Sequence, residues 1–110
     1  MSKRREPLVV ELIRAHGVGN AFRAATFIVS WAIAEDATRA EGPLSLTRYS
    51  EWWGQSRTTT WREQRSFEMC YPGQRTPEGV VAGLRLVVPE GGTAGYIRAQ
   101  VTAQVFGAVA

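Results

Sequence analysis

The chain has 110 residues, of which 45% are hydrophobic, 21% charged and 10% aromatic, which suffices for one packed core and is too short for two. Thirteen basic residues against ten acidic ones give a net charge of +3, and twelve of the thirteen are arginines. A lone cysteine, Cys70, excludes an intramolecular disulfide, and with a lone histidine, His16, it excludes a zinc site built from soft ligands. We expect one soluble domain spanning residues 1–110 in a reducing cytoplasm, without metal or cofactor.

The amino-terminal part predicts two helices. Apolar residues at helical spacing indicate the first, over residues 8–16. A turn over residues 17–20, with Asn20 as the cap, leads into a second helix from Phe22 to about Arg39. This second helix is apolar nearly all round, which is typical of the most buried helix of a domain. Its apolar run, residues 24–34, is shorter than the ~20 residues that span a bilayer, so we expect no membrane segment.

The carboxy-terminal part predicts further helices after a break at Gly42 and Pro43. Two of them lie on either side of Gly54, and Thr76 as a cap with Pro77 in the first turn predicts another, continuing to Val88. Residues 93–109 fit a helical face and also alternate as a strand does; their alanine content favours a helix. We therefore expect an all-α fold of about five helices. The alternative is a winged helix, in which residues 84–105 form a β-hairpin.

Residues 45–71 contain the most informative pattern. The first helix of this segment has an inward stripe at helical spacing, formed by Leu46, Tyr49, Ser50 and Trp53. Gly54 follows as a turn glycine, and Ser56 caps the next helix, which opens at Arg57. This order resembles a helix-turn-helix DNA-binding unit, whose second helix lies in the major groove. Ser50 and Gln55 depart from the alanine and the aliphatic residue that this family most often has. Residues 51–73 as a whole are similar to small helix-turn-helix proteins of actinobacteria and their phages.

A rotation of 100° per residue divides the second helix of this segment into two faces. The face predicted to point inward carries Thr60, Glu63, Gln64, Phe67, Cys70 and Tyr71. The opposite face carries Thr58, Arg62, Arg65 and Met69, with Trp61 at the border. Arginines and hydroxyls donate to guanine edges and phosphates, and Arg57 lies where the first backbone amides of a helix attract anions. A basic face backed by an apolar one suits entry into a DNA groove.

We therefore expect sequence-specific binding of duplex DNA, as a transcriptional regulator or a phage-type accessory factor. The candidate DNA-binding residues lie in or beside the predicted motif and are Arg48, Ser56, Arg57, Thr58, Thr59, Trp61, Arg62 and Arg65. The single histidine lies in the first helix and leaves no Ser-His-acid or Cys-His set, so we expect no enzymatic activity.

Two other interpretations of the same residues remain open. In a plain helix hairpin, the arginines of the second helix would be solvated and paired with Glu63 or Glu68 through i,i+3 contacts. In a helical adaptor, Trp52, Trp61 and the apolar segment after Thr93 would dock a protein partner instead of DNA. The final residues, 105–110, also suit a homodimer contact.

Overall fold

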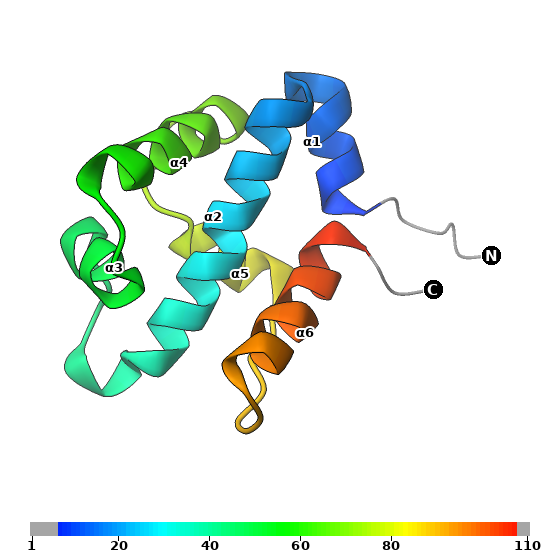
Figure 1. Ribbon diagram of the computed structural model, residues 1–110. Helices are drawn as coiled ribbons and strands as arrows, with labels where there is room; N and C mark the ends of the chain where they lie inside the picture. Colours follow the sequence, from blue (N-terminus) through cyan, green and yellow to red (C-terminus); the bar gives the residue numbers. More distant parts are fainter. Residues whose placement is uncertain (1–6, 108–110) are drawn as a thin grey trace.

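The computed structural model describes residues 7–107, which form helices joined by turns and loops, with no strand in that range (Figure 1). Its elements are α1 (Leu8–His16), α2 (Val18–Ala37), the short 3₁₀ helix η1 (Arg39–Glu41), α3 (Leu46–Trp53), α4 (Arg57–Cys70), α5 (Glu78–Leu84) and α6 (Ala94–Phe106). The all-α class is confirmed, with six α-helices in this range where about five were expected. The hairpin alternative is wrong, because residues 94–106 are helical and no strand occurs between residues 7 and 107.

The junction between α1 and α2 is shorter than the sequence suggested. Gly17 alone separates the two helices, with a φ of 87° that favours glycine. Asn20 is therefore not a cap: it lies inside α2, where its amide Nδ2 contacts the carbonyl of His16 at 3.5 Å. At the other end, α2 stops at Ala37, two residues before the predicted end, and the Thr38 hydroxyl donates to the carbonyl of Ala34 at 2.8 Å.

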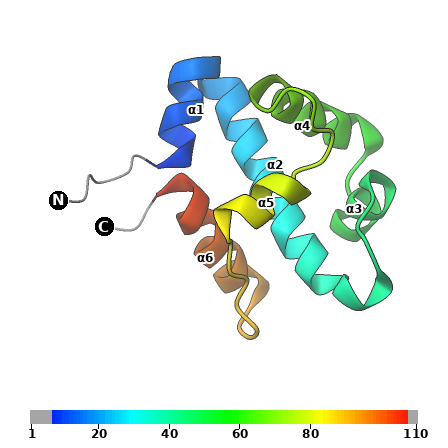
Figure 2. The ribbon, with the colours of Figure 1, turned by 180° about the vertical axis from the view of Figure 1, so that it is seen from behind.

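Helix α2 is the centre of the fold and packs against each of the other five α-helices (Figures 1 and 2). Alanines at its contact positions let neighbouring helices approach closely, and aromatic side chains fill the space between them. The ring of Phe27 makes edge contacts, with centroids 5.2 to 5.9 Å apart, to three buried rings: Trp31, Tyr49 and Phe67. This cluster joins α2 to α3 and α4, and aromatic pairs in such geometry stabilise a core beyond the area they bury.

Helix α5 is shorter than predicted at both ends. Pro77, not Thr76, is its N-cap residue, and no side chain caps it. The helix ends at Leu84 because Arg85 takes a left-handed conformation, with a φ of 53°, which turns the chain. The predicted continuation to Val88 is therefore wrong, and residues 86–93 form a loop that leads to α6.

The loop and the end of α6 are held by specific contacts. The side-chain amide of Gln104 accepts a hydrogen bond from the Val87 nitrogen and donates one to the Val87 carbonyl, both at 2.8 Å. Val101 and Val105 form the buried face of α6, as the helical pattern predicted. Gly107 then takes a φ of 70° directly against the ring of Pro7, so that α1 and α6 lie side by side. The last residues of the predicted dimer segment, 108–110, lie outside the described range.

Candidate nucleic-acid interface

Helices α3 and α4 are joined by a three-residue turn, Gly54 to Ser56. Gly54 is left-handed, with φ 64° and ψ 32°, a conformation that costs glycine little. The hydroxyl of Ser56 accepts a hydrogen bond from the Thr59 nitrogen at 3.1 Å and so caps α4, as the sequence predicted. At the start of α3, the Ser45 hydroxyl does the same for the Arg48 nitrogen. Both helices of the predicted motif therefore begin at hydroxyl caps.

A buried polar network sets the position of α3 against α4. Ser50 and Thr60 share a hydrogen bond at 2.7 Å. The amide of Gln55 donates to the Thr60 hydroxyl at 2.8 Å and to the Glu63 carboxylate at 2.7 Å, which also accepts from the Tyr49 hydroxyl at 3.1 Å. Ser50 and Gln55 are the two residues that depart from the helix-turn-helix pattern. Their partners show the reason, because polar side chains here bond to one another where apolar ones would pack.

The network shifts the acidity of its two ionisable members. Burial raises the pKa of Glu63 above its ordinary value, although the hydrogen bonds from Gln55 and Tyr49 partly oppose this. Burial, together with the nearby Glu63 charge, raises the pKa of Tyr49. The tyrosine therefore stays a neutral hydrogen-bond donor to the carboxylate.

The inner face of α4 is the one that the rotation predicted. Thr60, Glu63, Gln64 and Phe67 are buried, and the two residues at its carboxyl end, Cys70 and Tyr71, are partly buried. The Phe67 ring stacks on Tyr71 with centroids 5.0 Å apart. The burial of Ser66 was not predicted; its hydroxyl accepts from the Arg23 guanidinium and donates to the Asn20 side chain, each at 3.2 Å.

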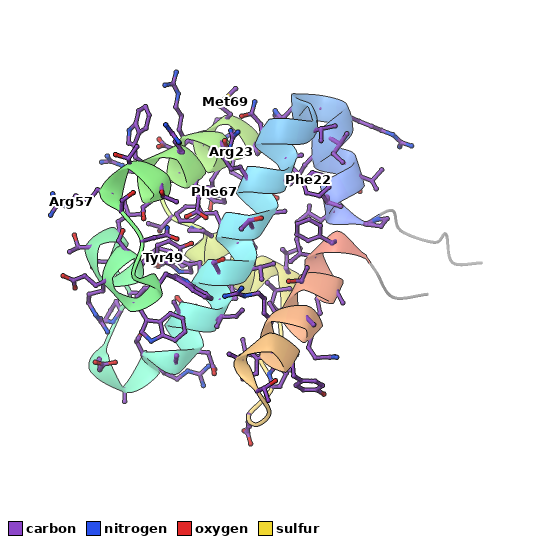
Figure 3. The ribbon with its side chains drawn as sticks, in the orientation of Figure 1. Phe22, Arg23, Tyr49, Arg57, Phe67 and Met69 are labelled. Atoms are coloured by element: carbon purple, nitrogen blue, oxygen red, sulfur yellow. The ribbon has the colours of Figure 1, made fainter. Side chains whose placement is uncertain are left out.

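The outer face of α4 is exposed along its whole length, from Arg57 to Met69, the two labelled ends of the helix in Figure 3. All of its predicted members are exposed, namely Arg57, Thr58, Trp61, Arg62, Arg65 and Met69. Arg65 lies over the indole of Trp61, 5.3 Å from the ring centroid, which orders two long side chains on the surface.

The arginines on the outer face of α4 are not neutralised by carboxylates of the described residues. Within residues 7–107, Arg57, Arg62 and Arg65 form no ion pair. Glu63 is turned inward to Tyr49 and Gln55, and Glu68 pairs with none of them. The ion pairs expected in a plain helix hairpin are therefore absent from the described residues, whereas the arginines are exposed to solvent, as that interpretation also expected.

Arg23 extends this basic surface onto α2, and sequence reasoning missed it. It lies with Arg62 and Arg65 around a shallow hollow between the two helices, and no carboxylate lines that hollow. The bond to Ser66 holds the Arg23 guanidinium beside α4. The sequence contains a feature that could have indicated this position, because Arg23 is the only charged residue between Val18 and Ala34 in an otherwise uncharged helix segment.

Three of the predicted site residues have structural partners of their own. The Arg48 guanidinium donates to the carbonyl of Pro43 at 2.7 Å, and to those of Glu41 and Gly42 at 3.4 Å, so it holds the loop before α3. Ser56 and Thr59 share a hydroxyl contact of 3.0 Å in the cap of α4. Arg48 therefore stabilises the loop before α3, and its assignment to the interface stays a prediction.

Comparisons of the chain with protein families, with curated proteins and with solved structures find no match. Over residues 7–107, no helix is both long and apolar enough to cross a membrane. The same residues contain no cluster of three or more potential metal ligands.

Proposed function

We propose that the protein binds duplex DNA in a sequence-specific manner, as a transcriptional regulator or a phage-type accessory factor, and that it is not an enzyme. The observation that carries this proposal is the outer face of α4, where three exposed arginines form no ion pair within residues 7–107, on a helix whose opposite face is packed against the core. A major groove about 12 Å wide admits one α-helix. The short turn and the polar network would hold α4 in place for such entry.

The position of each side chain along α4 suggests its role. Residues in the first turns of a recognition helix reach base edges, so we assign base contacts to Thr58, Trp61 and Arg62. Arg57, at the start of the helix, and Arg65, further along it, are then placed to meet the phosphates on the two walls of the groove. Arg23 adds a phosphate contact from α2.

The amount of basic charge predicts a steep salt dependence. The arginines of this face, together with Lys3, Arg4 and Arg5, which lie outside the described residues, supply roughly five or six contacts to DNA. Counterion release then gives a log-log slope of affinity against salt of about −4 to −5. A slope near zero in a titration with duplex DNA contradicts the proposal.

Two arginine variants separate base reading from phosphate anchoring. Arg62→Ala should lose preference at one base pair, by about 1 to 3 kcal/mol, and keep its nonspecific affinity. Arg57→Ala, which leaves the contact between Arg65 and Trp61 in place, should weaken binding to all sequences alike and reduce the salt slope by about one unit. Arg75→Ala is the matched control, because it removes the same charge from the exposed loop after α4.

Selection from randomised duplexes, with all three variants shown to be folded by thermal melting, provides the measurement. The role assignment fails if Arg62→Ala selects the parental motif and Arg57→Ala changes it. The DNA proposal itself fails if the parent protein enriches no motif, and a protein adaptor is then the better hypothesis.

A further inference from the structure

An apolar cleft lies where the carboxyl ends of α2 and α3 meet the start of α6 and the loop after α5. It has a volume of about 360 Å³, which is at the small end of the range for ligand pockets in proteins. Its apolar walls are formed chiefly by Ile33, Trp52, Trp53, Val88, Pro89 and Ile97. The DNA-facing side of α4 contributes none of the lining, so this cleft is separate from the proposed interface.

The walls of this cleft are fixed by contacts within the protein. The Trp53 indole donates to the carbonyl of Ser30 at 3.1 Å, and the Trp52 ring stands at 90° to it with centroids 4.8 Å apart. Across the cleft, the clamp between Gln104 and Val87 holds the loop that carries Val88 and Pro89. The two tryptophans and the clamped loop thus line one largely apolar cleft, which suits a ligand with a flat apolar ring.

The charged residues of the cleft differ in how far they are already neutralised. Asp36 forms an ion pair with Arg39 at 2.6 Å. Glu90 lies on the exposed part of the loop, and within residues 7–107 its carboxylate forms no hydrogen bond or ion pair. Arg98 is held with its guanidinium 5.1 Å from the centroid of the Trp53 ring, and within residues 7–107 it forms no hydrogen bond or ion pair. A guanidinium that lies over a ring keeps the N–H groups in its own plane available for hydrogen bonds. Two of these N–H groups, side by side, match the two oxygens of a carboxylate.

We propose that this cleft binds a small planar aromatic carboxylate. The ring of the ligand lies against Trp52 and the apolar wall, and its carboxylate accepts paired hydrogen bonds from Arg98. The oriented guanidinium favours an anion over a cation, because a group already fixed by stacking loses little freedom on binding, whereas Glu90 would first have to be ordered.

Three probes that share one ring and differ in charge test the proposal: indole-3-acetate, indole-3-acetamide and tryptamine. Each is titrated by calorimetry and by ¹H–¹⁵N spectra, in which the four tryptophan indole N–H groups report separately. We expect indole-3-acetate to bind about tenfold or more tightly than the other two. Its addition should shift the signals of Trp52 and Trp53 and leave those of Trp31, in the core, and Trp61, on α4, in place.

Arg98→Gln should remove the preference for the carboxylate, so that the acetate and the acetamide bind alike. Arg75→Gln, the matched control, should preserve the preference, and thermal melting should show both variants folded. Tighter binding of tryptamine, no shift at Trp52 and Trp53 with any probe, or a retained tenfold preference in Arg98→Gln each overturns the proposal. None of these measurements involves DNA, so their outcome is independent of the DNA-binding proposal.

Discussion

Truncation of Phe67 to alanine tests the orientation of α4, on which the proposed interface depends. The Phe67 side chain is fully buried and contacts the rings of Phe27 and Tyr71, with centroids 5.7 and 5.0 Å apart. Loss of a buried phenylalanine costs about 3 to 5 kcal/mol, because the lost transfer energy adds to that of the cavity left behind. That is a large part of the total stability of about 5 to 15 kcal/mol that a domain of this size has.

The expected shift in melting temperature follows from the length of the chain. An unfolding entropy of roughly 2.1 cal/mol/K per residue gives about 230 cal/mol/K for the 110 residues. Phe67→Ala should therefore lower the melting temperature by about 13 to 22 °C. Met69→Ala is the matched control, since Met69 is on the same helix but half exposed, and it should change stability by less than about 0.5 kcal/mol.

Calorimetry or circular dichroism on the parent and both variants measures the effect. Equal melting temperatures for Phe67→Ala and Met69→Ala would mean that α4 is turned differently about its axis. The arginines would then no longer share an outward face, and the reasoning for the DNA interface would be refuted along with the packing.

Two further predictions concern a buried charge and a constrained turn. Burial raises the pKa of Glu63 in the folded protein above its ordinary value of 4.5. Between the ordinary and the raised pKa, the folded protein binds more protons than the unfolded chain, so the free energy of unfolding falls as the pH rises through this interval. Glu63→Gln, which keeps an acceptor for Tyr49, should lose less stability between pH 4.5 and 7 than the parent; parallel profiles of melting temperature against pH would contradict this. Gly107→Ala should destabilise the fold by about 1 kcal/mol or more beyond Gly54→Ala in urea unfolding, because both glycines have nearly the same left-handed conformation, with φ of 70° and 64°, but only a Cβ at 107 meets Pro7. Equal midpoints for the two alanine variants would show that this contact does not constrain the fold.

The features that the sequence predicted well are those that depend on residues close together in the chain. The two faces of α4 follow from a rotation of 100° per residue, and the cap at Ser56 and the turn at Gly54 depend on residues within four positions. The burial of α2 was predictable as well, because a helix that is apolar all round has no face suited to water.

The features that the sequence did not predict depend on contacts between distant segments. Arg23 joins the basic surface only because its partner Ser66, 43 residues away, is packed beside it. The loop after α5 takes its course from the clamp at Gln104, 17 residues beyond Val87. The early start of α2 is a different case, since one glycine with positive φ proved enough for a turn to which the sequence assigned four residues.

The central position of α2 determines how the molecule can open. Amide protons in the middle of α2 are covered by helices on every side, so they should exchange with solvent only through global unfolding. Helix α5 has seven residues, of which one is buried, so its amide protons should exchange through local opening at a lower free energy than those of α2. Because α4 is joined to α2 through the rings of Phe67 and Phe27, its exposed arginines stand on a helix packed directly against this central one. A ligand of that face would meet a rigid helix, and binding would need to order only side chains.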